Sequence, residues 1–179
     1  GEDAMHAEEV ARLVDRFGPE IYRYCRRLTG GAQQAEDLYQ QTFLKCLELT
    51  LTLDEQNNPR ALLFSLAGGI FKNEQRKAGR RLAIARPVEL DADNVPEPPA
   101  PDDPAQTAQN RAQSAALLAA VDRLPPKLRI PITLAYGFDW NLEKIARMEK
   151  APVGTIKSRL HKARQLLKKE MEAQGYGTF

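Results

Sequence analysis

Apolar residues recur at helical spacing along most of this 179-residue chain, and no segment shows convincing strand alternation. The first apolar stripe consists of Val10, Leu13, Val14 and Phe17. Their i, i+3, i+4, i+7 spacing predicts an amphipathic helix. A second helix is expected to begin after the Gly18–Pro19 pair and to end at Thr29–Gly31.

Two more helices are predicted before residue 82. One has an apolar face made of Ala35, Leu38, Tyr39, Thr42, Phe43, Cys46 and Leu47. Its opposite face carries Glu36, Asp37, Gln40, Gln41, Lys45 and Glu48. The next helix begins at Pro59, a residue suited to a first helical turn. It is expected to bury Leu62, Leu63, Leu66, Ile70 and Phe71, and it then becomes strongly basic.

The C-terminal part of the chain predicts four helices, the last two of which form a helix-turn-helix. An Ala- and Leu-rich helix ends before Pro125, and a second one, with Leu128, Ile132, Leu134 and Ala135 as its apolar positions, ends at Gly137. Asn141 can cap a short third helix, and Pro152 fits the start of a long basic one. A short helix, a tight turn and a longer basic helix are typical of a helix-turn-helix.

A segment rich in Pro and Asp, residues 86–106, separates the two helical parts. It has no hydrophobic period and too little apolar surface to offset the entropy of ordering. The predicted fold is therefore all-α, with two small helical domains joined by a flexible, acidic, Pro-rich linker. The predicted bounds are 5–82, 83–108 and 109–174, and the helix-turn-helix belongs to the second domain.

Charge is distributed in blocks that the formal net charge of +2 conceals. Residues 60–81 hold six basic and one acidic side chain, and residues 141–179 hold nine basic and four acidic ones. Two basic blocks are two candidate sites for a polyanion. No apolar run is long enough to cross a bilayer, so no membrane insertion and a cytoplasmic location are expected.

Residue chemistry argues against an enzyme or a metal site. The two cysteines, Cys25 and Cys46, each fall on an apolar helix stripe and are expected to be buried free thiols. With only His6 and His161 in addition, no metal-ligand spacing exists. No catalytic residues and no cofactor are predicted.

The last long helix is the strongest candidate for a DNA-reading element. Ile156, Leu160, Ala163, Leu167 and Met171 form one narrow stripe that must pack inward. In helix-turn-helix docking, the N-terminal turns of the second helix meet base edges, while further cations hold phosphates. The predicted DNA-binding residues are Thr155, Lys157, Ser158, Arg159, His161, Lys162 and Arg164. A basic amphipathic helix taken alone is more often a solvated face or a ligand for membranes or proteins.

Three segments of the chain resemble bacterial sigma factors of the extracytoplasmic-function type. Residues 124–171, which contain "GTIKSRLHKAR", resemble the domain that reads the minus-thirty-five promoter element. Residues 17–48, with "AEDLYQQTF", resemble the first conserved block of the family. Residues 59–81 resemble the block that handles the minus-ten element.

The resemblance implies roles for residues outside the helix-turn-helix. It implies that Asp37, Gln40 and Gln41 contact the β′ coiled-coil of core RNA polymerase, whose β subunit is a further expected contact. It implies that Asn73, Arg76, Lys77, Arg80 and Arg81 handle the minus-ten element. It also implies promoter DNA and an anti-sigma factor as partners, and a linker that enters the RNA channel of the polymerase; a plain flexible tether is an equally open interpretation of residues 86–106.

Two positions depart from the family pattern. Lys150 stands where members often have Gly in the turn of the helix-turn-helix, and Val153 stands where an acidic residue is common. A lysine in a left-handed conformation would cost about 1 kcal/mol, so a differently shaped turn is expected.

The function predicted from the sequence is that of a sigma factor that directs core RNA polymerase to particular promoters. One alternative is a free-standing helix-turn-helix regulator, which would leave the basic block at 60–81 without a role. Another is a helical protein whose basic helices meet acidic lipids or partner proteins.

Overall fold

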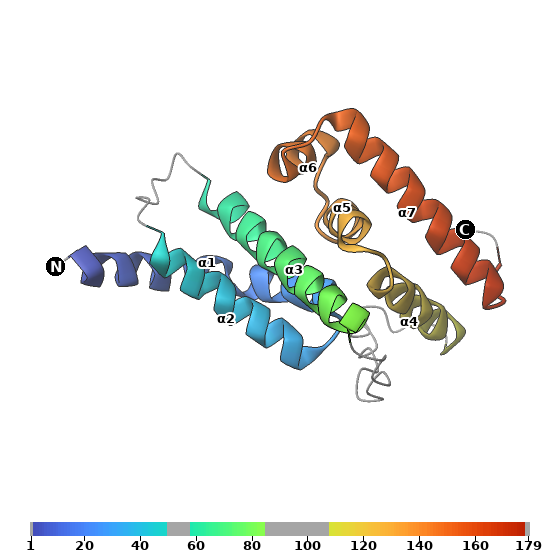
Figure 1. Ribbon diagram of the computed structural model, residues 1–179, viewed down its shortest axis with the longest axis horizontal. Coiled ribbons are helices and arrows are strands. Elements are labelled where there is room, and N and C mark those ends of the chain that lie inside the picture. Colours follow the sequence, from blue (N-terminus) through green and yellow to red (C-terminus); the bar gives the residue numbers. More distant parts are fainter. Residues whose placement is uncertain (1, 50–57, 85–107, 178–179) are drawn as a thin grey trace. The chain divides into compact units, whose positions relative to one another are not determined.

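The computed structural model describes residues 2–49, 58–84 and 108–177, and within them the chain forms seven α-helices (Figure 1). The chain divides into two compact units, residues 1–89 and 90–179. An all-helical, two-domain fold was predicted and is confirmed. The Pro- and Asp-rich segment at 86–106 lies outside the described residues.

The first unit contains α1 (Glu2–Thr29), α2 (Ala32–Glu48) and α3 (Pro59–Ile84). Each helix packs against the other two, and α2 and α3 run side by side in Figure 1. Gly30 has a φ of 74°, a left-handed conformation that ends α1 at the predicted place. The largest buried side chains at the centre of this unit are Ile21, Tyr24, Leu28, Leu63 and Phe64.

The predicted break at Gly18–Pro19 is wrong, because α1 continues through both residues as a single helix. Proline in a helix removes one backbone hydrogen bond, so the packing on α2 must offset this loss. Gly18 allows that packing: it is buried, and a Cβ at its position would lie 2.8 Å from the Tyr39 hydroxyl. Close contact between α1 and α2 thus keeps the two halves of α1 in line.

The buried face of α3 is rotated from the predicted one. Leu63, Phe64, Ala67 and Phe71 are buried, whereas Leu62, Leu66 and Ile70 are only half-buried. The assignment of Phe71 to the core is confirmed. On α2, Leu47 was also expected to be buried but is 43% exposed.

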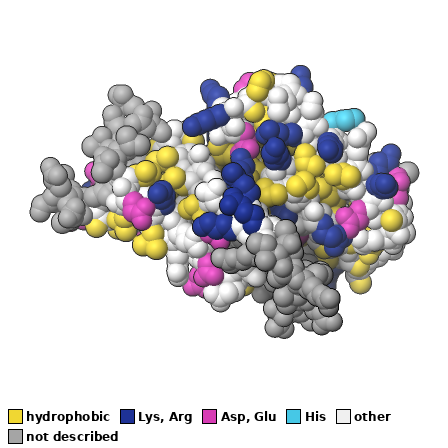
Figure 2. Space-filling model, in the orientation of Figure 1, with side chains coloured by type: hydrophobic (Ala, Val, Ile, Leu, Met, Phe, Trp, Pro, Cys, Tyr) yellow, Lys and Arg dark blue, Asp and Glu magenta, His cyan; other side chains and the backbone are white. Residues whose placement is uncertain are grey.

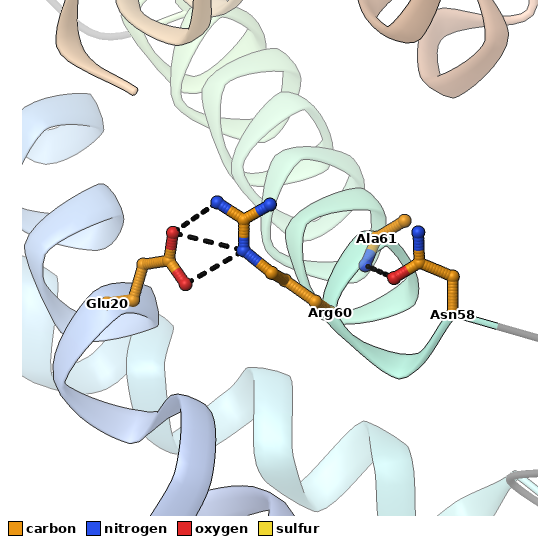
Figure 3. A network of polar contacts seen from close by, with 4 residues as sticks. All are labelled: Glu20, Asn58, Arg60 and Ala61. Atoms are coloured by element: carbon orange, nitrogen blue, oxygen red, sulfur yellow. Dashed lines mark hydrogen bonds and ion pairs between the residues drawn. The ribbon is translucent and has the colours of Figure 1, made fainter. Parts of the chain in front are cut away.

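The start of α3 is anchored to α1 by a forked ion pair (Figure 3). Arg60 Nε donates to both carboxylate oxygens of Glu20, at 3.1 and 2.9 Å, and Nη2 donates to Oε1. These hydrogen bonds raise the pKa of the Arg60 guanidinium. Asn58, with a φ of 46°, caps α3 by accepting from the Ala61 amide at 3.2 Å.

The second unit contains α4 (Ala108–Asp122), α5 (Pro126–Gly137), α6 (Leu142–Glu149) and α7 (Val153–Ala173). Helix α5 packs against α6 and α7, and α4 packs against α7. Seven consecutive residues of α5 are buried, from Leu128 to Leu134, so this helix forms the centre of the unit. The stop at Gly137 is confirmed.

Arg129, within this buried run, was not identified from the sequence. It is only 8% exposed, and its guanidinium donates to the carbonyls of Leu124 and Asp122. Burial lowers the pKa of Arg129, while the Asp122 carboxylate acts in the opposite direction. Arg129 thereby satisfies backbone carbonyls where α4 ends and ties α4 to α5.

Both cysteines are buried free thiols, as predicted. Burial raises the pKa of the Cys25 thiol to about 12 and that of Cys46 to about 11. The two thiols are therefore neutral and unreactive in the folded protein at physiological pH.

Candidate nucleic-acid interface

Helices α6 and α7 are joined by a short turn that contains Lys150. Asn141 caps α6 as predicted, because its side-chain oxygen accepts from the Lys144 amide at 2.8 Å. Lys150 follows α6 with φ 51° and ψ 45°, a left-handed conformation. The Ala151 amide then donates to the Ala146 carbonyl at 3.0 Å, which satisfies the end of α6.

The turn therefore keeps a left-handed residue even though that residue is lysine, and the expectation of a differently shaped turn is wrong. Helix α7 begins at Val153, with Pro152 as its N-cap residue rather than in its first turn.

Helix α7 separates its faces as predicted. The five residues of the apolar stripe, from Ile156 to Met171, are all buried. The predicted DNA-binding residues Lys157, Ser158, His161, Lys162 and Arg164 are exposed, and Thr155 and Arg159 are half-buried. The first three turns of α7 thus present lysine, serine and histidine groups to solvent.

The cations of α7 differ in their surroundings. Arg159 lies 3.8 Å from the Glu149 carboxylate of α6, whose side chain is only 4% exposed. Arg164 donates to the Tyr136 hydroxyl of α5 at 3.0 Å. Neither contact could be foreseen, because no helical period links residues on different helices.

The residues expected at the minus-ten element lie together on α3. Asn73, Arg76, Lys77 and Arg80 stand at i, i+3, i+4, i+7, so they share one face, and all four are exposed. Lys77 lies 4.0 Å from Glu74 on the same helix. Arg81 belongs to the helical part of α3, but its side chain is outside the described residues.

The residues expected to contact polymerase lie on the solvent face of α2. Asp37, Gln40 and Gln41 are all exposed, and Gln33 Nε2 donates to Asp37 Oδ1 at 3.3 Å. Leu44 continues this face and is 58% exposed, and no role was predicted for it from the sequence. Asp37, Gln41 and Leu44 stand at i, i+4, i+7, and this spacing could have identified Leu44 from the sequence.

Each candidate site therefore occupies one helix face, and each face combines charged side chains with neutral polar ones. On the face of the molecule shown in Figure 2, Lys and Arg side chains stand among acidic and hydrophobic ones. Among the described residues, no group of histidine, cysteine or acidic side chains could hold a metal ion. The same residues include no helix long and apolar enough to cross a membrane.

Comparison with known proteins assigns both units. Residues 13–81 match the model of Sigma-70 region 2, and residues 114–167 match that of Sigma-70 region 4. These regions define the class as sigma factors, in which region 4 contains the helix-turn-helix.

Relatives of known identity narrow the class. The chain is 32% identical over 177 residues to the ECF RNA polymerase sigma factor SigL of Mycobacterium tuberculosis H37Rv, covering 98% of this chain and 96% of SigL. It is 25% identical over 170 residues to SigW of Bacillus subtilis, covering 92% and 89%. The chain belongs to the ECF RNA polymerase sigma factors.

A solved structure shares the fold. The sigma factor RpoE of Bartonella quintana, crystallised with the anti-sigma factor NepR, aligns with a TM-score of 0.69 and 21% identity, covering 92% of this chain and 98% of RpoE.

Membership of the family confirms the main functional prediction. The protein acts in transcription initiation, binds DNA through region 4 and is not an enzyme. The free-standing regulator and the lipid- or protein-binding helical protein are therefore set aside.

Proposed function

We propose that this sigma factor divides its work among the three helix faces described above, within domains bounded at 5–82, 83–108 and 109–174. The face of α2 with Asp37, Gln40 and Gln41 binds core RNA polymerase at the β′ coiled-coil, and the β subunit adds further contacts. The basic end of α3 handles the minus-ten element, and α7 reads the minus-thirty-five element.

The exposed face of α7 is the observation that carries this proposal. Lys157, Ser158 and His161 project from the first turns of a helix held by a buried stripe and a closed turn. These side chains can donate to guanine, or donate and accept at base edges, while other cations hold phosphates. On α3, Asn73, Arg76, Lys77 and Arg80 provide the cations and the amide that strand separation requires.

Polymerase binding is tested by a pull-down of purified core RNA polymerase with the full chain. The double variant Asp37→Arg, Gln41→Arg is expected to lose binding, because both positions are exposed on the proposed face. The matched control is Ala11→Arg, Asp15→Arg, which makes the same change in charge at exposed positions of α1. Equal binding by both double variants would contradict the proposed α2 interface.

Promoter reading is tested by selecting duplexes from a random library with the reconstituted holoenzyme. Lys157→Ala and His161→Ala should change the preferred bases, with each good base contact worth about 1–3 kcal/mol. Lys169→Ala, at an exposed position of the same helix, should weaken binding without changing preference. Unchanged preference in both of the first two variants would remove them from the reading surface.

Regulation by an anti-sigma factor belongs to the same proposal. The RpoE chain that shares this fold is bound to an anti-sigma factor in its structure. A partner of that kind would compete with core polymerase for this chain. The test measures transcription from a promoter that depends on this sigma factor, with and without each co-expressed protein. If none of these proteins reduces that transcription, regulation by an anti-sigma factor is contradicted.

A further inference from the structure

One edge of α7 has its charges compensated within the protein. Arg159 lies beside the buried carboxylate of Glu149. Glu170, which stands on the same edge three turns later, forms an ion pair with Arg123. Because Arg159 and Arg123 both have acidic partners, this edge of α7 offers little net charge to a polyanion.

The opposite edge of α7 is different. Lys157, His161, Arg164 and Lys168 stand at i, i+4, i+7, i+11, so they form one row beside the buried stripe, and all four are exposed. We name this row the basic edge. Within the described part of the chain, none of the four forms an ion pair with an acidic side chain. The basic edge therefore presents cations without an acidic partner on the side of α7 that adjoins Tyr136 of α5, while Lys162 and Lys169 lie on the outer face of the helix.

Tyr136 of α5 adjoins this edge. Its side chain is 64% exposed, the highest value among the exposed large hydrophobic residues of the described chain. Arg164 Nη1 donates to the Tyr136 hydroxyl oxygen at 3.0 Å. The phenol proton is then directed away from the guanidinium and can be donated to another acceptor.

Together the two side chains suit a phosphate. Arg164 has four N–H groups left after its bond to Tyr136, and guanidinium groups bind phosphate oxygens well. The tyrosine hydroxyl adds a neutral donor beside them and holds the long arginine side chain in place. A base edge is a poorer match, because this pair lies a turn beyond His161, past the N-terminal turns of α7 that enter the groove.

We propose that Tyr136 and Arg164 jointly bind one backbone phosphate of promoter DNA, and that the part of the basic edge beyond His161, Arg164 and Lys168, follows the backbone of that same strand. The inference rests on the proposed reading of the minus-thirty-five element by α7. It assigns a DNA contact to α5, outside the helix-turn-helix, and it predicts which side of α7 lies along a phosphate backbone.

The test uses holoenzyme and the duplex that the wild-type protein selects from a random library. Single methylphosphonates, which remove one phosphate charge each, are placed along both strands and binding is measured by fluorescence anisotropy. Wild-type affinity should fall at one phosphate in particular. Tyr136→Phe and Arg164→Gln should each bind the unmodified duplex about three- to tenfold more weakly, and each should lose sensitivity at that same phosphate.

Salt dependence separates the two contributions. Arg164→Gln removes a charge, so the slope of log affinity against log salt concentration should decrease by about 0.9. Tyr136→Phe removes a neutral donor, so affinity should fall while the slope stays unchanged. Neither variant should change the selected bases. The matched control is Tyr22→Phe, at a 38%-exposed tyrosine of α1, which should behave as wild type.

Two results would overturn the proposal. One is a Tyr136→Phe holoenzyme whose affinity and methylphosphonate profile equal those of the wild type; the other is loss of sensitivity at different phosphates in the two variants. Failure of the proposed function looks different, because the wild-type holoenzyme would then select no sequence that depends on Lys157 or His161.

Discussion

The forked ion pair between Glu20 and Arg60 predicts a coupling energy that can be measured within the first unit. The perturbation is a double-mutant cycle with Glu20→Gln, Arg60→Gln and the double variant. Three hydrogen bonds join the two side chains and tie the start of α3 to α1. Arg60 also lies over the Phe64 ring, 5.4 Å from its centroid, so each single variant loses more than the pair itself.

The magnitude of the coupling energy follows from the partial burial of the two side chains. The side chains of Arg60 and Glu20 are 32% and 28% exposed, so water still screens the pair in part. Fully exposed pairs contribute about 0–1 kcal/mol, and hydrogen bonds to charged groups contribute about 1.5–3 kcal/mol. The geometry is bidentate and the exposure intermediate, so we expect a coupling of about 1–2 kcal/mol. For a unit of this size that corresponds to roughly a 1 M change in the urea midpoint.

The chain provides an internal control for the assay. Its single tryptophan, Trp140, is buried in the second unit and reports only on that unit. Far-UV circular dichroism reports on the helices of both units. Urea titrations followed by both signals should show a shift that appears in circular dichroism and not in Trp140 fluorescence.

Two outcomes would refute the reasoning. A coupling energy below about 0.5 kcal/mol would mean that this pair behaves like an ordinary surface ion pair. An equal shift of the Trp140 transition would mean that the two units unfold together, and the cycle would then not report on the first unit alone.

Two further variants test the second unit through the urea midpoint of Trp140 fluorescence. Arg129→Met removes the buried donor to the Leu124 and Asp122 carbonyls and should destabilise this unit by about 2–4 kcal/mol. A loss below about 1 kcal/mol would show that water satisfies those carbonyls. Lys150→Gly removes the steric strain of the left-handed conformation at φ 51° and should stabilise the unit by about 0.5–1 kcal/mol. Lys150→Ala keeps that strain and should change the stability little. Equal effects of the two variants would contradict the assigned strain.

Helical periodicity identified most of the fold from the sequence alone. The stripe from Ile156 to Met171, the Asn141 cap and the stops at Gly30 and Gly137 were all predicted and all hold. These features depend on residues close together in the chain, which is why local patterns suffice. The exposed faces of α2, α3 and α7 follow for the same reason, since the face opposite a buried stripe meets solvent.

Features that join different helices were decided by the tertiary structure. Continuation of α1 through Pro19 depends on the approach of Tyr39 to Gly18, and the choice of Phe64 over Leu62 as a core residue of α3 depends on where α1 and α2 lie. Lys150 takes a left-handed conformation because the packing of α6 against α7 requires a tight turn.

The sequence by itself thus determined most of the helices, the buried stripe of α7 and the family to which the chain belongs. Only the tertiary structure placed Arg159 beside Glu149 and Tyr136 beside Arg164, and so gave α7 one compensated edge and one basic edge. The physical reason is that helical spacing determines which residues share a face, but charges from other helices decide how much of that face's charge remains for DNA.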